Sequence, residues 1–174
     1  MQPFEKTASQ AAGEIRRGEL SPIALMESIL KRITDLEPFL KSWVTLDSEM
    51  ALESARQSER ALQRNNPLGA LHGVPIGVKD IFYTAGVRTT ACSPIHADFI
   101  PTYDATAVSK LKAEGAIILG KTVTTQFAFA DPSPTVNPWN ASHTPGGSSS
   151  GSAAAVAARM CPAARAHTSR YRCC

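Results

Sequence analysis

The sequence has no long apolar run. Its 174 residues contain no stretch of the length that a membrane-spanning helix needs, and no apolar segment follows Met1 as in a secretory signal peptide. The four cysteines show no metal-ligand pair spacing in the body of the chain, and the adjacent Cys173 and Cys174 are a weak metal signal. We therefore expect a cytoplasmic protein with free thiols and no membrane partner.

A concentrated basic patch is also missing. The net charge is +3, and the lysines and arginines are spread along the chain, from Arg16 and Arg17 through Lys31 and Arg32 to the last ten residues. A nucleic-acid surface needs such charges gathered on one face. The composition therefore predicts no direct nucleic-acid partner.

The most informative segment is residues 143–158, which read HTPGGSSSGSAAAVAA. Gly146 and Gly147 permit backbone conformations that are closed to other residues, and the alanines that follow favour a helix. Serine hydroxyls would then stand at a helix N-terminus, where free N–H groups can hold an anion or a developing oxyanion. Composition alone leaves a flexible glycine–serine linker as the alternative.

The first third of the chain has helical patterns. Ser21-Pro22 is typical of a helix start, an apolar stripe at helical spacing follows it, and Pro38 is expected to end this helix. A second helix is expected to start at residue 47 or 48 and to break at residues 65–67. Such stripes indicate core packing rather than a functional surface.

The middle of the chain changes to a mixed pattern. Residues 74–80 predict a strand that ends near Lys79, with Pro75 among its first residues or on a sheet edge. Residues 107–115 predict a helix with a glycine stop, and residues 116–119 predict a buried strand. The alternation of helix and strand indicates an α/β fold.

Two lysines lie in apolar segments, and we predict a functional role for only one of them. Burial disfavours the charged ammonium, so Lys79 can act as a base, although a strand-end lysine can also extend to water. Lys121 lies in GAIILGKT at 115–122, which fits the phosphate-loop pattern literally. We expect no nucleotide there, because the residues inside the motif are themselves a strand and a helix precedes them.

The histidines show no diagnostic spacing to a carboxylate or a cysteine. The sequence alone leaves a serine–histidine–aspartate triad open, since such triads are assembled from distant positions. The four histidines are His72, His96, His143 and His167.

Several segments together resemble the amidase signature family of serine hydrolases. The resemblance extends from about residue 10 to about residue 164 and, besides 143–158, rests on residues 73–80 (GVPIGVKD), 103–108, 114–122, 124–128 and 137–140 (NPWN). It implies that residues 1–164 are the N-terminal part of a single, larger α/β amidase domain. In that fold a mixed, mostly parallel sheet is flanked by helices.

The resemblance also implies a lysine–serine–serine triad. Lys79 matches the catalytic lysine, Ser148 matches the bridging serine that follows a cis peptide bond, and Ser149 would be an auxiliary hydroxyl. Ser150 stands where the family usually has glycine. The family's mechanism implies a small-molecule amide substrate and neither a metal nor an organic cofactor.

The family's nucleophilic serine is missing from this chain. It lies about two dozen residues after the bridging serine in a Gly-Thr-x-x-x-Gly-Ser segment, whereas Arg172 stands at about that distance here. We interpret residues 165–174 as an aberrant tail, with the hypothesis that it is read out of frame, and expect the chain as it stands to be inactive. Sequencing the genomic locus through and beyond the stop codon tests this interpretation.

Three functions follow from these observations. The segments 122–128, 132–135 and 143–145 resemble stand-alone amidases, which makes an inactive amidase fragment the leading hypothesis. The A subunit of glutamyl-tRNA(Gln) amidotransferase, which hydrolyses glutamine and passes ammonia to misacylated tRNA, is the alternative within the family. A non-catalytic fragment that holds an anion or another ligand is the alternative outside it.

Overall fold

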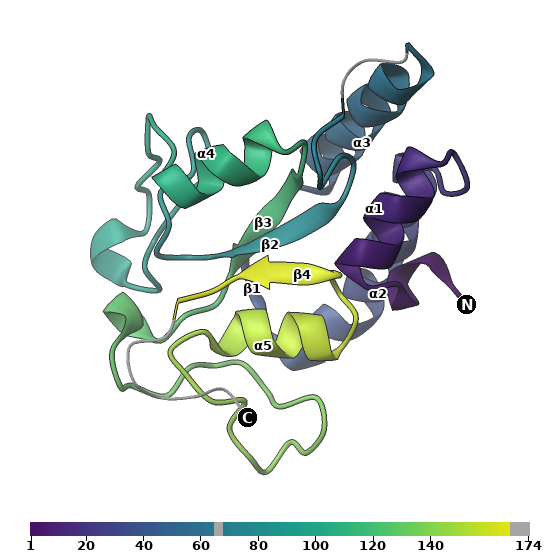
Figure 1. The fold of residues 1–174 in the computed structure, drawn as a ribbon. Coiled ribbons are helices and arrows are strands. Elements are labelled where there is room, and N and C mark those ends of the chain that lie inside the picture. Colours follow the sequence, from purple (N-terminus) through teal and green to yellow (C-terminus); the bar gives the residue numbers. More distant parts are fainter. Residues whose placement is uncertain (65–67, 168–174) are drawn as a thin grey trace.

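The computed structural model describes residues 1–64 and 68–167 (Figure 1). The helices and strands, in chain order, are η1 (Pro3–Glu5), α1 (Ala8–Arg16), α2 (Pro22–Leu40), β1 (Trp43–Leu46), α3 (Ser48–Gln63), β2 (Pro75–Lys79), η2 (Pro94–His96), α4 (Thr106–Ala113), β3 (Ile117–Thr122), η3 (Gln126–Ala128), α5 (Ser150–Ala157) and β4 (Ala163–Arg165). Within this part of the chain, no helix has the length and apolar character of a membrane span.

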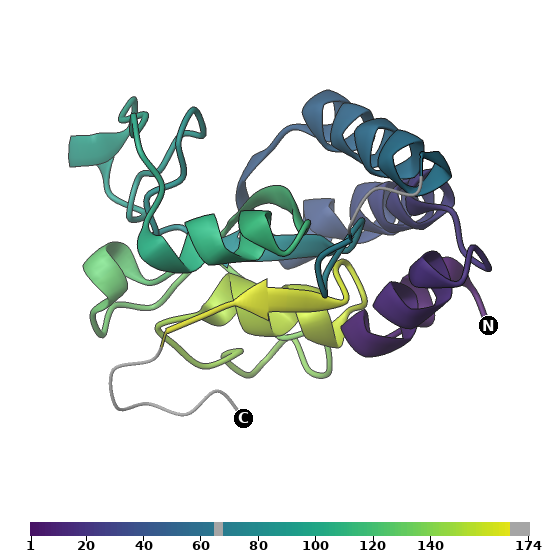
Figure 2. The ribbon, with the colours of Figure 1, turned by 45° about the horizontal axis from the view of Figure 1, so that its top comes forward.

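The described strands form one sheet in the order β1-β3-β2-β4. β2 runs parallel to both β3 and β4, whereas β1 is antiparallel to β3. Figures 1 and 2 show α4 on one side of this sheet and α5 on the other. The expected α/β architecture, a mixed and mostly parallel sheet flanked by helices, is therefore confirmed.

The core lies where α1, α2 and α3 meet one end of the sheet. Its apolar side chains come from the helical stripes and from the strands, and Leu25, Met26 and Ile29 of α2 have no exposed surface. α2 begins where the sequence predicts, because Ser21 Oγ accepts hydrogen bonds from the amides of Ile23 and Ala24.

The prediction that Pro38 ends this helix is wrong. Pro38 lies inside the last turn of α2, and the helix ends at Leu40 with Lys41 in the left-handed region at φ 51°. A proline near a helix end removes one hydrogen bond and leaves the rest of the ladder intact. The Glu37 carboxylate supports the following turn, since it accepts bonds from the amides of Ser42 and Trp43 at 2.9 Å each.

The predicted second helix is α3, and Asp47 caps it by accepting the Met50 amide at 2.9 Å. α3 ends at Gln63, and the expected break at residues 65–67 lies outside the described residues. The helix expected over 107–115 is α4, followed by Gly115 at φ 79°.

The predicted strand 74–80 is β2, which lies between β3 and β4 and is buried throughout. Pro75 is its first residue, as expected, but the alternative that it marks a sheet edge is wrong. A proline is tolerated there because the first residue of a strand can lack a ladder donor.

β3 is longer than predicted and runs through Gly120, Lys121 and Thr122. A Cβ at Gly120 would lie 2.4 Å from the Thr45 carbonyl oxygen, so glycine permits the close approach of β1. The glycine inside this strand therefore marks a backbone contact rather than a turn.

α1 and the short strands β1 and β4 were not delimited in advance. Trp43–Leu46 has the aromatic and β-branched residues of a strand, but its four residues stand between two strong helix patterns. β4 crosses residue 164, where the resemblance ends, and residues 168–174 of the expected aberrant tail lie outside the described part. The boundary between 164 and 165 stays a prediction.

Candidate active site

Lys79 and Ser148 meet at the carboxyl end of β2. Lys79 is the last residue of this strand and has no exposed surface, and Ser148 is 6% exposed. Lys79 Nζ donates a hydrogen bond to Ser148 Oγ at 2.6 Å. The structure thus brings together the two residues that the resemblance singles out, although they are 69 positions apart in the sequence.

Ser148 is held from its backbone as well as from its side chain. The peptide bond between Gly147 and Ser148 is cis. The carbonyl oxygen of Ser148 accepts hydrogen bonds from Thr124 Oγ1 at 2.9 Å and from the Thr125 amide at 3.0 Å. The segment that follows β3 therefore fixes the serine that faces Lys79.

Ser149 lies beside the same pair as the N-cap residue of α5. Its hydroxyl donates to the carbonyl oxygen of His167 at 3.0 Å, and Lys79 Nζ donates to that oxygen at 2.5 Å. The chain that leaves β4 thus returns to the lysine and the serines. The auxiliary role of Ser149 stays a prediction, but its position next to Lys79 is a feature of the structure.

The first turn of α5 packs directly against the backbone of neighbouring segments. A Cβ on Gly151 would lie 2.3 Å from the Ser42 carbonyl oxygen and 2.4 Å from the Val123 nitrogen. Ser152 Oγ shares a 2.6 Å hydrogen bond with Thr122 Oγ1, whereas the buried hydroxyl of Ser150 has no hydrogen-bond partner in the described residues. The linker alternative is therefore excluded, because these serines begin a packed helix.

A buried amine in hydrogen-bond contact with a hydroxyl can transfer a proton. Lys79 Nζ and Ser148 Oγ have the separation that direct transfer requires. A third group beside Ser148 could deliver its proton through the Ser148 hydroxyl to the amine. Such a relay would turn a weakly acidic hydroxyl into a nucleophile.

Lys121 is buried inside the fold rather than presented to a phosphate. Its Nζ donates to the Phe82 carbonyl oxygen at 2.5 Å and to Thr89 Oγ1 at 2.6 Å, and it lies 3.8 Å from Asp80 Oδ1. Burial lowers the pKa of Lys121 to about 8, although the Asp80 carboxylate opposes this shift. The expectation that 115–122 is not a phosphate loop agrees with this position, since Lys121 belongs to β3.

The contacts of the histidines are not those of a catalytic triad. His72 Nε2 lies 2.8 Å from the Ser58 carbonyl oxygen, and His143 Nδ1 lies 3.2 Å from Ser142 Oγ. His167 meets Lys79 through its backbone carbonyl. In residues 1–64 and 68–167, these contacts do not assemble a serine–histidine–aspartate relay.

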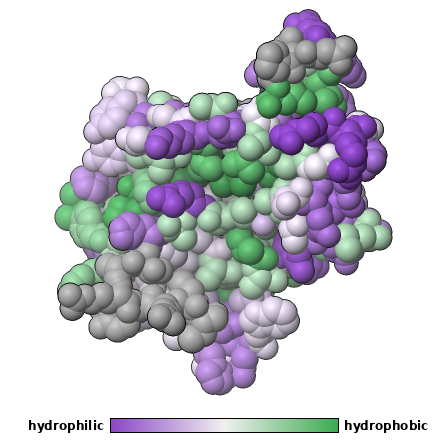
Figure 3. Space-filling view, in the orientation of Figure 1, coloured by the Kyte–Doolittle hydropathy of each residue, from purple (hydrophilic) through white to green (hydrophobic). Residues whose placement is uncertain are grey.

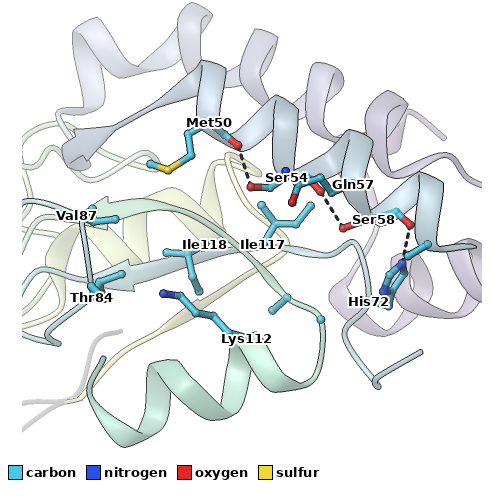
Figure 4. Close-up of a pocket in the computed structure, with 14 residues that line it drawn as sticks. Met50, Ser54, Gln57, Ser58, His72, Thr84, Val87, Lys112, Ile117 and Ile118 are labelled. Carbon is cyan, nitrogen blue, oxygen red and sulfur yellow. Dashed lines mark hydrogen bonds between the residues drawn. The ribbon is translucent and has the colours of Figure 1, made fainter. Parts of the chain in front are cut away.

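A separate cavity of about 450 Å³ lies between α3 and α4, away from Lys79 and Ser148. Figure 3 shows apolar residues gathered over β2 and β3 between these helices, and Figure 4 shows the lining side chains. Its polar groups already have partners: Ser54 and Ser58 donate to carbonyl oxygens of their own helix, and Lys112 pairs with Asp104. The cavity therefore differs from the lysine–serine pair, where a buried amine contacts a hydroxyl directly.

Three residues around the pair escaped the sequence analysis. Asp80 follows Lys79 directly, and its carboxylate is buried, although a charged residue just beyond an apolar strand could have been singled out. Thr124 and Cys92 come from two different loops, and nothing in the local sequence connects them with Ser148. Their contacts depend on the packing of β2 beside β3.

The chain is similar to known proteins over most of its length. The family model described as Amidase matches residues 24–166. The A subunit of glutamyl-tRNA(Gln) amidotransferase from Azotobacter vinelandii is 47% identical over 164 residues, which are 91% of this chain and 34% of that protein. The same protein from Thioalkalivibrio sulfidiphilus is 45% identical over 166 residues, which are 92% of this chain and 34% of that protein.

Solved structures are also similar to this chain over most of its length. The peptide amidase of Stenotrophomonas maltophilia has a TM-score of 0.81 at 32% identity, and the match covers 90% of this chain and 35% of that one. A fatty acid amide hydrolase has a TM-score of 0.84 at 25% identity, over 92% of this chain and 29% of that one. The chain therefore spans about a third of the length of the relatives that it matches.

Proposed function

Because the chain belongs to the amidase family, we propose that Lys79 and Ser148 serve amide-bond hydrolysis as the base and the bridging hydroxyl of a serine hydrolase. The observation that carries this proposal is the buried 2.6 Å hydrogen bond between Lys79 Nζ and Ser148 Oγ. The expected substrate is a small molecule with a linear amide bond, and the cytoplasmic location expected from the sequence remains part of the proposal.

In the proposed chemistry the relay first takes a proton from the nucleophile and later returns a proton to the leaving group. The nucleophilic serine gives its proton to Ser148 Oγ while Ser148 gives its own to neutral Lys79, and the serine oxygen attacks the amide carbonyl. The protonated relay then returns a proton to the leaving nitrogen, and the C–N bond breaks. Water hydrolyses the resulting acyl-enzyme by the same route, so the pair ends each turnover in its starting state.

The position of His167 supports a nucleophile that follows β4. Its carbonyl oxygen is held by Lys79 Nζ and Ser149 Oγ, so the chain beyond β4 leads to the lysine–serine pair. The family resemblance expects the nucleophile a few residues later, at about position 172. Because this chain has no Gly-Ser segment there, we propose that it has no turnover as it stands and that residues 165–174 replace the family sequence.

A second candidate function is that of the A subunit of an amidotransferase. The names of the curated relatives favour it, since eight relatives at 40–47% identity are A subunits of glutamyl-tRNA(Gln) amidotransferase. The solved structures at 32–34% identity that are named peptide amidase favour the stand-alone form. Both functions use the same hydrolytic step, so the proposed roles of Lys79 and Ser148 do not depend on the choice.

Two chimaeras test the roles and the choice together. Residues 1–164 of this chain are joined to the remaining two thirds of the peptide amidase, and separately to the remainder of the amidotransferase protein from Azotobacter vinelandii. We expect at least one chimaera to react with a fluorophosphonate probe and to release ammonia, from a peptide amide in the first case and from glutamine in the second. Lys79→Ala and Ser148→Ala should each lower turnover about a hundredfold or more.

The matched control is Lys112→Met, which removes a lysine that pairs with Asp104 at the surface. It should leave turnover unchanged. The proposal is overturned if an active chimaera keeps its rate when Lys79 or Ser148 is replaced by alanine.

A further inference from the structure

The carboxylate of Asp80 lies at the centre of a buried set of hydrogen bonds. Its Oδ2 accepts from the Thr90 hydroxyl at 2.6 Å, from the Thr90 amide at 3.0 Å and from the Cys92 amide at 3.3 Å. Its Oδ1 has no hydrogen-bond partner in the described residues and faces Lys121 Nζ at 3.8 Å. One carboxylate therefore connects the end of β2 with the loop at residues 90–92 and with β3.

The loop at 90–92 has a backbone that needs support. Ala91 and Cys92 have φ values of 51° and 50°, in the left-handed region that costs residues with a Cβ about 1 kcal/mol or more each. The Ala91 amide donates to the Asp80 carbonyl oxygen at 2.9 Å. Asp80 thus holds this turn through both its backbone and its side chain.

The same turn supports the segment that holds Ser148. Cys92 Sγ accepts a hydrogen bond from the Thr124 amide at 3.3 Å, and Thr124 Oγ1 donates to the Ser148 carbonyl oxygen at 2.9 Å. Ser148 Oγ accepts from Lys79 Nζ, and Lys79 precedes Asp80 in the chain. The contacts therefore close a ring through Lys79, Asp80, Cys92, Thr124 and Ser148.

We propose that Asp80 is a positioning residue for the lysine–serine pair and acts through Cys92 and Thr124, with Lys121 as its counterion. Its importance for catalysis rests on the proposed function, whereas the ring itself does not. Both partners of the Lys79–Ser148 hydrogen bond are fixed by one connected structure, so a change at Asp80 moves Ser148 relative to Lys79. The acceptor that the ring requires is Oδ2 of Asp80.

Asparagine does not test this role. All the hydrogen bonds to Thr90 and Cys92 end on Oδ2, and Lys121 Nζ lies 3.8 Å from Oδ1, beyond hydrogen-bond distance. An asparagine oxygen at the Oδ2 position could accept the same bonds. Asp80→Ala removes the acceptor and therefore breaks the ring.

The test measures the ring directly in the ¹³C,¹⁵N-labelled chain, without substrate. The scalar coupling across the hydrogen bond from the Thr125 amide to the Ser148 carbonyl reports the position of Ser148, and the coupling from the Gly73 amide to the Gly115 carbonyl reports the fold elsewhere. We expect Asp80→Ala to lower the first coupling at least twofold and to leave the second unchanged.

Asp104→Ala is the matched control, since Asp104 also accepts a backbone amide, that of Ala85 at 2.8 Å, and pairs with Lys112 outside the ring. Neither coupling should change in this variant. If Asp80→Ala does not fold, Thr124→Val replaces it: loss of the Thr124 hydroxyl should lower the Ser148 coupling, and Thr124→Ser should restore it.

Retention of the Ser148 coupling in Asp80→Ala, or in Thr124→Val where that variant is used, would overturn the positioning role. These couplings need no nucleophile and no turnover. An inactive chimaera whose Ser148 coupling is intact would therefore count against the proposed function, whereas an active chimaera that keeps this coupling in Asp80→Ala would count against the inference about Asp80.

Discussion

Lys121 Nζ lies 3.8 Å from Asp80 Oδ1, and neither side chain has any exposed surface. The two residues come from neighbouring parallel strands, Lys121 from β3 and Asp80 from the position just after β2. Desolvation favours the neutral amine and lowers the pKa of Lys121 to about 8, while the carboxylate opposes the shift. The pair is therefore a source of pH-dependent stability.

The free energy of unfolding should gain a contribution from Lys121 as the pH rises from 8 to 10. In this range the unfolded chain keeps the lysine proton, with a pKa near 10.4, and the folded chain loses it, so the unfolded state binds more protons. Relative to Lys121→Met, the free energy of unfolding of the parent chain should rise by about 1 kcal/mol per pH unit. Urea titrations at pH 7, 8, 9 and 10 measure this difference.

The surface variant Lys112→Met provides the comparison for charge alone, because Lys112 is partly exposed. The difference in free energy of unfolding between Lys112→Met and the parent chain should not change over the same pH range. If the difference in free energy of unfolding between Lys121→Met and the parent chain is also independent of pH, the buried amine is not deprotonated in the folded state below pH 10.

Two glycines should respond very differently to alanine. A Cβ at Gly120 would lie 2.4 Å from the Thr45 carbonyl oxygen, so β1 and β3 would have to separate, and we expect a loss of about 3 kcal/mol or more. Gly18 has open space around its Cβ position and a φ of 72°, so Gly18→Ala should cost about 1 kcal/mol from backbone strain. Similar urea midpoints for the two variants would contradict the close approach of β1.

Ser21 connects two helices as well as capping one. Its hydroxyl accepts the amides of Ile23 and Ala24 and forms a hydrogen bond with Glu59 of α3. Ser21→Ala should cost about 2 kcal/mol, from loss of the cap and of the contact between helices. Glu59→Ala should cost about 1 kcal/mol, and the double variant should cost less than the sum. Additive costs in thermal unfolding would show that the two side chains do not interact.

The sequence predicts the helices and strands whose own residues carry capping or apolar patterns. Ser21 caps α2 and Asp47 caps α3 through their own local hydrogen bonds, so their positions follow from neighbouring residues. β1 escaped prediction because four residues carry little pattern of their own, and its strand conformation depends on pairing with β3. Pro38 was misjudged because a proline in the last turn of a helix breaks few hydrogen bonds.

Some features of the site follow from local sequence, and others depend on how distant segments pack. Lys79 and Ser148 could be singled out from motifs, and their individual neighbourhoods at a strand end and before a helix follow from local pattern. Their 2.6 Å contact and the role of Asp80 depend on segments that meet only after β2, β3 and α5 have packed. The same holds for Lys121, because the carboxylate that faces its buried amine belongs to Asp80, the residue after a neighbouring strand.

Lys79 should contribute little to stability, in contrast with an ordinary core residue. Burial of an amine costs free energy, and Lys79→Met removes this cost together with the hydrogen bonds to Ser148 and His167. The His167 carbonyl oxygen keeps the Ser149 hydroxyl as a donor, so the loss at Ser148 is the main opposing cost. We expect Lys79→Met to change the free energy of unfolding by about 1 kcal/mol or less, whereas Ile29→Ala in the core should cost about 2–5 kcal/mol.

Urea unfolding of both variants measures this contrast in the chain itself. A large loss in Lys79→Met, comparable with that of Ile29→Ala, would make Lys79 a structural residue and weaken its assignment as the base. A small loss, together with the loss of turnover in the Lys79→Ala chimaera, would mean that the buried amine serves the reaction rather than the fold, as expected where function conflicts with stability.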